Sequence, residues 1–305
     1  MRSARSRLCI LVLPLSLIAL SCQPSDVYRL KPATVGTRCR AGDLARSSAF
    51  VLQCQRGRWR ASSSIAGVVS LINAANAKAT AVAVHRRLLV FSRTTGFRHE
   101  SITDGTSMLT AQLPGAGIEV AFTEDPSMFT DAGLARFGAV LFLSTTGDVL
   151  DDTQQGAFER FVHRGGGYIG VHSASDTEYD WPFYGQLVGA WFQGHPQPTE
   201  VPIRVEAGDQ LSTASLPSTF SLVDEVYDFR TNPRSDPATK VLLSIDPAAA
   251  QTGGWTMGAD HPISWQKEFA GGRSFYTNLG HMAETWRRPE FVSHLVGGIR
   301  WVLGN

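Results

Sequence analysis

From residue 86 to residue 171, short apolar runs alternate with amphipathic stretches. The apolar runs have the length of buried strands and lie at 88–91, 118–122, 139–143 and 165–171. The stretches between them have helical periodicity and lie at 100–113, 131–137 and 151–164. Strands that alternate with helices in this way are joined by right-handed crossovers into a parallel sheet. The pattern predicts an α/β fold of the flavodoxin-like, doubly wound kind, with a mostly parallel sheet.

The pattern changes after residue 171, where loops rich in Pro, Gly and aromatic residues separate short strand candidates. These candidates lie at 203–205, 223–229, 241–245, 263–269 and 274–277. A helix at 290–303 closes the chain, with Phe291, Leu295 and Ile299 on its inner face. We therefore expect one large domain over 86–305.

The first 85 residues divide by composition into a signal peptide (1–21), a polar tether (22–37), a small hairpin module (38–60) and an Ala/Ser-rich linker (61–85). Three arginines precede the apolar run 8–20, which is too short to span a membrane and has the length of a signal-peptide core. The exit at Cys22 resembles a bacterial lipoprotein signal, although ordinary cleavage after Ser21 also fits. We expect an exported protein of the bacterial cell envelope, lipid-anchored through Cys22 at the outer membrane.

The cysteine count agrees with a lipid on Cys22. Cys9 leaves with the signal, and three remaining cysteines cannot all pair within one exported chain. With Cys22 lipidated, Cys39 and Cys54 are free to form one disulfide that closes the small module.

Charge is distributed unevenly along the chain. Residues 1–60 hold eleven Lys/Arg and two Asp/Glu, whereas residues 61–305 hold seventeen Lys/Arg and twenty-five Asp/Glu. A mildly acidic main domain argues against nucleic acid as its partner.

Histidines recur at predicted strand ends and in the loops that follow. His99 follows the first strand, His172 ends the fourth, and His281 follows the strand candidate at 274–277. His195 and His261 lie in Gly/Pro-rich loops. Because ligands of open α/β sheets bind outside the carboxyl ends of the strands, these side chains predict one polar cleft.

Several reaction classes lack support. The glycines at 165–167 precede a strand rather than a helix, which disfavours a phosphate loop, and the chain has no G-x-S-x-G elbow. It also has no H-E-x-x-H or C-x-x-C motif, so a metal site would be assembled from distant residues such as His172, His195, His281 and Glu225. The sequence identifies neither a cofactor nor a metal.

Aromatic residues in the loops that carry the histidines suit stacking on the faces of a small sugar ligand.

A set of segments, in this order along the chain, resembles the ThuA-like (trehalose-utilisation) family. They are 96–99, 165–174, Asp176 with 180–182, 189–196, 224–227, 260–265 and 272–281. The resemblance implies a class I glutamine-amidotransferase-like fold and a role in carbohydrate metabolism. In the amidotransferases the strand-to-helix elbow carries a nucleophilic cysteine, whereas this chain has His172 in that region, so amidotransferase activity is not expected.

We interpret the protein as a sugar-modifying enzyme that acts on a sugar or keto-sugar by histidine/carboxylate acid–base chemistry. The catalytic candidates are His172, Glu225 and His281. The substrate-binding candidates are Arg98, His99, Asp176, Trp181, His195, Tyr227, Asp260 and His261. Two alternatives stay open: a non-catalytic carbohydrate-binding protein and a metal-dependent hydrolase built from the histidines.

Overall fold

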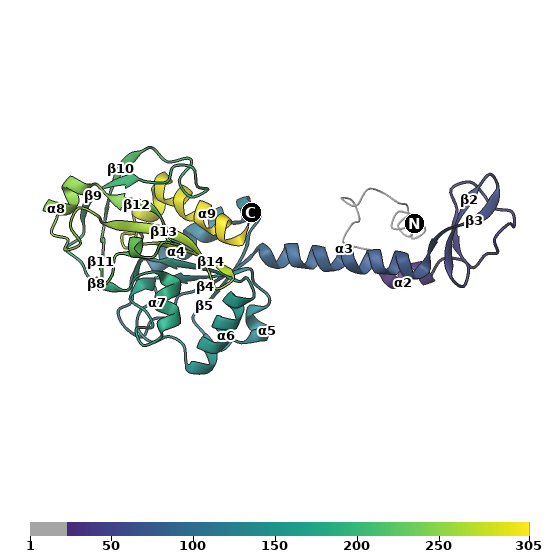
Figure 1. Cartoon of the computed structure of the whole chain (residues 1–305), viewed down its shortest axis with the longest axis horizontal. Coiled ribbons are helices and arrows are strands. Elements are labelled where there is room, and N and C mark those ends of the chain that lie inside the picture. The colour runs from purple at the N-terminus through teal and green to yellow at the C-terminus, as the bar shows by residue number, and fades with distance from the viewer. Residues whose placement is uncertain (1–22, 305) are drawn as a thin grey trace. The chain divides into compact units, whose positions relative to one another are not determined.

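The computed structural model describes residues 23–304, which form two compact units divided between Ala83 and Val84 (Figure 1). The predicted signal peptide and Cys22 lie outside the described residues. Among the described residues, no helix is long and apolar enough to cross a membrane.

The N-terminal unit is built on a three-stranded antiparallel sheet in the order β1-β2-β3. Its elements are α2 (Pro24–Tyr28), β1 (Leu44–Arg46), β2 (Phe50–Gln55), β3 (Arg58–Ser64) and the start of α3 (Ile65–His85), which continues into the second unit. A disulfide joins Cys39 to Cys54, whose Cα atoms lie 5.7 Å apart, and the predicted pairing is confirmed.

Two stretches expected to be a tether and a linker are ordered instead. Val27 of α2 is fully buried against Val51 and Ile65, so the segment before Cys39 packs onto the small module. The stretch expected to link the domains completes β3 and then forms the 21-residue helix α3. Its many alanines explain the helix, because alanine has the highest helix propensity of all residues.

The second unit contains a nine-stranded sheet in the order β10-β9-β12-β13-β14-β7-β6-β4-β5. Its parallel strands are β4 (Arg87–Phe91), β5 (Glu119–Thr123), β6 (Ala139–Leu143), β7 (Gly167–Val171) and β14 (Gly272–Thr277). Their order, β5-β4-β6-β7-β14, fits the 2-1-3-4-5 order of flavodoxin-like sheets. The prediction of a mixed α/β domain with a largely parallel central sheet is confirmed.

The remaining strands extend the sheet in antiparallel fashion from β14. They are β13 (Pro262–Phe269), β12 (Lys240–Ile245), β9 (Thr199–Val205) and β10 (Thr219–Asp224). A separate two-stranded ladder pairs β8 (Phe192–Gly194) with β11 (Asp228–Phe229). The candidate strand at 223–229 is therefore divided between β10 and β11, with Glu225 in the three-residue segment 225–227 that connects them.

Helices cover both faces of the parallel part (Figure 1). They are α4 (Ile102–Gln112), α5 (Asp131–Leu134), α6 (Asp152–His163), α7 (Pro182–Val188) and α9 (Pro289–Leu303). The unit also contains α8 (Pro247–Thr252), which follows β12, and the short 3-10 turns η1 (Pro114–Ala116), η2 (Pro126–Met128), η3 (His172–Ser175), η4 (Pro233–Ser235) and η5 (Thr285–Arg287). Leu88 and Val90 of β4 pack in the core under α4 and α9, whereas Leu89 and Phe91 pack in the core under α6 and α7. Burial on both faces explains why the parallel strands are continuous apolar runs.

Candidate active site

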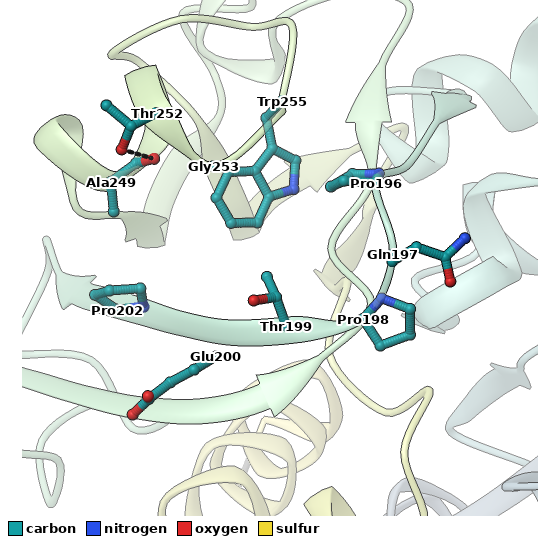
Figure 2. A pocket seen from close by; sticks show the side chains of 10 residues that line it. All are labelled: Pro196, Gln197, Pro198, Thr199, Glu200, Pro202, Ala249, Thr252, Gly253 and Trp255. Carbon is teal, nitrogen blue, oxygen red and sulfur yellow. Dashed lines mark hydrogen bonds between the residues drawn. The ribbon is translucent and has the colours of Figure 1, made fainter.

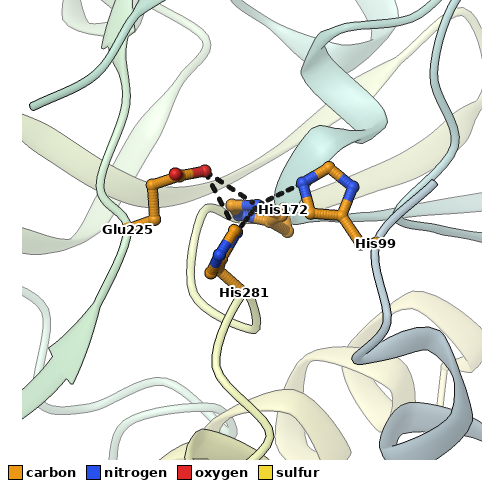
Figure 3. A group of neighbouring side chains, drawn as sticks. All are labelled: His99, His172, Glu225 and His281. Carbon is orange, nitrogen blue, oxygen red and sulfur yellow. Dashed lines mark hydrogen bonds and ion pairs between the residues drawn. The ribbon is translucent and has the colours of Figure 1, made fainter. Parts of the chain in front are cut away.

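Three strand ends and one connecting segment bring four ionisable side chains together (Figure 3). His99 lies in the loop after β4, His172 follows β7 directly, and His281 lies four residues after β14. Glu225 lies in the segment directly after β10. One nitrogen or oxygen from each of these four side chains lies within 4.8 Å of all the others. We call this group the histidine cluster.

His172 lies at the centre of the histidine cluster and is fully buried. Its backbone has a φ of 51°, in the left-handed region that side chains other than glycine rarely adopt. This turn starts η3 and aims the ring across the carboxyl end of the sheet. Its Nδ1 lies 2.8 Å from the carbonyl oxygen of Asn278. Because a carbonyl only accepts, Nδ1 carries the proton in the neutral ring and Nε2 presents a lone pair.

Four polar atoms surround Nε2 of His172. The hydroxyl of Tyr227 lies 2.8 Å away, Nε2 of His99 and Nδ1 of His281 each lie 3.2 Å away, and Oε2 of Glu225 lies 3.6 Å away. The three imidazole rings meet edge to face, with interplanar angles of 88°, 86° and 71°. The nitrogen atoms therefore converge on one small volume rather than stacking past each other.

The carboxylate of Glu225 is contacted by histidines through both oxygens. Nδ1 of His281 lies 3.0 Å from Oε2, and Nδ1 of His195 lies 3.1 Å from Oε1. His195 lies at the outer edge of the site, with 35% of its side chain exposed, whereas Glu225 is buried.

Asp224 fixes the backbone on both sides of the histidine cluster. Its fully buried carboxylate accepts hydrogen bonds from the backbone N–H groups of Gly280, His281 and Met282 at 2.8 to 3.2 Å. It also accepts one from the N–H of Glu225 at 2.9 Å. A single carboxylate thus ties the end of β10 to the loop that carries His281.

The local electrostatics keep the buried imidazole of His99 neutral. Burial, reinforced by the nearby His172 and His281, lowers the pKa of His99 to about 3. The hydrogen bond to Glu225 raises the pKa of His281. Burial alone would raise the pKa of Glu225, but the interactions of its carboxylate with His172 and His281 outweigh it and hold that pKa below its usual range. The site therefore combines an ionised carboxylate with neutral and readily protonated imidazoles.

A protein-family model described as ThuA, trehalose utilisation, matches residues 87–302, which is well over half of the chain. The chain belongs to the ThuA family. The resemblance stated from the sequence is thereby confirmed. None of the curated proteins matches the chain.

Two solved ThuA-like proteins share the fold of this ThuA chain. One, from Bacteroides uniformis, is 24% identical with a TM-score of 0.62, and the match covers 72% of this chain and 92% of that one. The other, from Parabacteroides merdae, is 18% identical with a TM-score of 0.60, and the match covers 71% and 89%.

Six of the residues selected from the sequence lie in or beside the histidine cluster of this ThuA domain. They are His99, His172, His195, Glu225 and His281, and Tyr227 joins them through its hydroxyl and through ring contacts with His172 and His195 at 4.5 and 5.6 Å. Burial raises the pKa of Tyr227 well above its usual range, so the phenol remains a hydrogen-bond donor.

The other five selected residues do not join it. Arg98 pairs with Glu124 at 2.6 Å, Asp260 pairs with Arg234 at 2.9 Å, and Asp176 accepts a hydrogen bond from Tyr179. His261 lies 2.8 Å from the carbonyl oxygen of Tyr227 and supports the backbone behind the site.

Trp181 also lies apart from the histidine cluster, because its ring belongs to the core. It is buried, contacts Phe158 and Tyr184, and donates from Nε1 to Glu159 at 2.8 Å. Its faces are therefore not free to stack on a sugar.

Sequence reasoning did not select Asn278, which supports two members of the site. Its backbone oxygen holds His172, and its side-chain oxygen accepts from the N–H of Tyr227 at 2.9 Å. The sequence feature that could have identified Asn278 is its position as a polar residue directly after a buried strand.

A pocket of about 490 Å³ lies beside the loop that follows His195 (Figure 2). It is lined by Pro196, Gln197, Pro198, Thr199, Glu200, Pro202, Ala249, Thr252, Gly253 and Trp255. Nε1 of Trp255 donates to the carbonyl of Val226, which connects this pocket wall to the residue after Glu225. The pocket wall combines an indole, proline rings and polar side chains.

Proposed function

We propose that this ThuA protein is an enzyme of carbohydrate utilisation that acts on a sugar or keto-sugar at the histidine cluster. In this proposal it works by histidine/carboxylate acid–base chemistry on a class I glutamine-amidotransferase-like fold. The observation that carries the proposal is the position of Glu225, with His281 on one carboxylate oxygen and His195 on the other. A buried carboxylate that orients two imidazoles is a typical arrangement for moving a proton to or from a substrate.

In this proposal, the position of each residue in the site determines its role in the reaction. Glu225 orients the imidazole of His281, and the backbone oxygen of Asn278 orients the imidazole of His172. A sugar hydroxyl, or a carbon next to a sugar carbonyl, placed against these rings would exchange a proton with one of them. Tyr227 supplies a hydroxyl beside the same point, where it can donate to a sugar oxygen.

Amidotransferase chemistry does not fit this site. His172 occupies the turn directly after β7, and the chain has no cysteine beyond Cys54. Thioester formation with glutamine needs a thiolate at the elbow, so the superfamily's amide chemistry is not part of the proposal.

The substrate class is supported by the pocket beside His195 as well as by the family. The prolines at 196, 198 and 202 offer apolar surface, while Thr199, Glu200 and Gln197 offer hydrogen-bonding groups. Sugar recognition combines these two kinds of contact.

The test is a screen of the purified protein against disaccharides and their keto forms, with turnover and binding measured separately. We expect turnover of at least one compound and its loss in His172→Gln, which keeps size and hydrogen bonding. His163→Gln is the matched control, because His163 is exposed on α6, away from the site. Saturable sugar binding without turnover would make the protein a carbohydrate-binding protein instead, and full turnover in His172→Gln would overturn the assigned reaction centre.

We further propose that the protein is exported and lipid-anchored at the outer membrane through Cys22. The motivation is the arginine-rich start, the apolar run 8–20 and the cysteine at its exit. Labelled fatty acid should appear on the wild-type protein in cells and disappear in Cys22→Ala. Wild-type protein that stays unlabelled in the soluble fraction would overturn the anchor.

A further inference from the structure

Hydrogen bonding alone does not account for the contacts around Nε2 of His172. With Nδ1 donating to Asn278, the neutral ring has one lone pair at Nε2, and the hydroxyl of Tyr227 at 2.8 Å can fill it. The nitrogens of His99 and His281 nevertheless approach the same atom to 3.2 Å. A single lone pair at Nε2 accepts one hydrogen bond, so whichever of the three neighbouring groups fills it, the other two crowd the same atom, whereas a cation between the ring nitrogens would bind all of them.

We propose that His99, His172, His281 and Glu225 together bind a divalent transition-metal ion of the zinc class. This site coincides with the proposed reaction centre, so the inference deepens the proposed function and rests on the same residues.

The separations between the donor atoms fit such an ion. With bonds of about 2.0 to 2.1 Å, as zinc makes to imidazole and carboxylate, the edge of a tetrahedron of ligands is about 3.3 to 3.4 Å. Four observed separations lie around this value: 3.2 Å for His99 to His172, 3.2 Å for His172 to His281, 3.0 Å for His281 to Glu225 and 3.6 Å for His172 to Glu225. The edge-to-face arrangement of the three rings lets each lone pair point inward.

The donor types select the class of ion. Three imidazole nitrogens and one carboxylate oxygen suit Zn²⁺ and its first-row neighbours, whereas Ca²⁺ and Mg²⁺ prefer sites made entirely of oxygen. Burial of His99, His172 and Glu225 also shields the ion's ligands from water.

The surrounding groups hold the ligands in position. Nδ1 of His172 donates to a backbone carbonyl, and Nδ1 of His99 lies 3.2 Å from the hydroxyl of Ser173. Glu225 contacts the other ligands through Oε2, while its Oε1 meets His195. A metal-binding histidine typically bonds its second ring nitrogen to a carbonyl or other polar group, which fixes the ring and its tautomer.

A bound ion would change which residues carry out the proposed proton transfer. With His172 and His281 serving as ligands, an ion at this point would polarise a sugar carbonyl or hydroxyl. Proton transfer then falls to His195, which contacts Glu225 from outside the ligand set.

The experiment measures metal directly, without reference to turnover. The full chain, purified through a tag that contains no histidine, is analysed for metal content by mass spectrometry and titrated with Zn²⁺ and Co²⁺ after chelation. We expect about one ion per chain, and visible Co²⁺ absorption of the intensity typical of a four- or five-coordinate site. His281→Gln, at a partly exposed position that tolerates substitution better than buried His172, should weaken Zn²⁺ binding by more than about 100-fold, because loss of outer-shell partners alone costs 10- to 100-fold.

His163→Gln, which removes an exposed histidine from α6, should bind Zn²⁺ as tightly as the wild type. Ser173→Ala should weaken binding by about 10-fold through the loss of the contact to His99. Wild-type protein that contains no metal and fails to bind added Zn²⁺ or Co²⁺ would overturn the inference, as would equal binding by His281→Gln. Metal binding without sugar turnover would contradict only the proposed function, and full turnover by the chelated protein would contradict only the metal.

Discussion

Nδ1 of His195 lies 3.1 Å from Oε1 of Glu225, the carboxylate oxygen that His281 does not contact. His195 is also the most exposed of the histidines around Glu225, so its ring can be reached from outside the buried site. This position suits the proton transfer that we propose for His195.

We therefore expect His195→Gln to lower the turnover number by about 100-fold or more while leaving the fold intact, the usual loss when an acid–base group is removed. The measurement is steady-state kinetics on the substrate found by the screen, with thermal melting in parallel. His163→Gln provides the baseline for losing one exposed histidine. Undiminished turnover in His195→Gln would assign His195 to binding or to structure.

Asp224→Ala should destabilise the second unit by about 3 kcal/mol or more, since four backbone N–H groups lose their buried acceptor. Chemical denaturation followed by circular dichroism measures the change. Asp246→Ala is a matched control, because Asp246 caps the short helix α8 and its loss should cost only about 1 kcal/mol. Equal effects of the two substitutions would mean that Asp224 does not hold the loop of His281.

The sequence could predict the meeting of His99, His172 and His281 because of a general property of parallel sheets. Their strands end at one edge, so residues that follow them converge wherever they lie along the chain. Glu225 was harder to place, because β10 reaches the site only through the antiparallel extension, whose partners are non-local. The sequence also predicts that Tyr227, two residues further along, lies near the site, although no local pattern indicates where its hydroxyl points.

The residues that fell outside the site show where sequence patterns stop being informative. An arginine or aspartate in a loop looks the same whether it meets a ligand or a partner such as Glu124 or Arg234. Trp181 likewise lies in a sequence context typical of an aromatic residue that stacks on a sugar. In the structure its ring instead packs against Phe158 of α6 and donates a hydrogen bond to Glu159 of the same helix. Only the three-dimensional packing separates these cases.

The disulfide should matter for the N-terminal unit, whose buried core is small. Cys39 and Cys54 are 15 residues apart, and closing such a loop stabilises by about 3 kcal/mol in the chain-entropy model. In the variant with both cysteines changed to Ser, amides of β2 and β3 should exchange hydrogen much faster, while those of β6 and β7 keep the wild-type rate. Unchanged exchange in β2 and β3 would show that packing alone holds the module.

His294 of α9 predicts a loss of stability in acid that is independent of the active site. It is fully buried, contacts Ser264 and the carbonyl of Ser212, and burial lowers its pKa to about 4 from an ordinary 6.5. Between these values the unfolded chain binds a proton that the folded chain does not, so stability falls as the pH drops from 6.5 toward 4. By linkage the loss reaches about 2 to 3 kcal/mol near pH 4.5.

Urea denaturation of wild type and His294→Gln at pH 7.5, 6.0 and 4.5 isolates this contribution, because other titrating groups act on both proteins alike. Buried Glu178 is one of these groups: burial raises its pKa to about 7, which works in the opposite direction over the same range. We expect the stability of the wild type, measured relative to the variant, to decline between pH 6.5 and pH 4.5, and His163→Gln to behave as the wild type. A difference between wild type and His294→Gln that stays constant with pH would mean that His294 is protonated equally in both states.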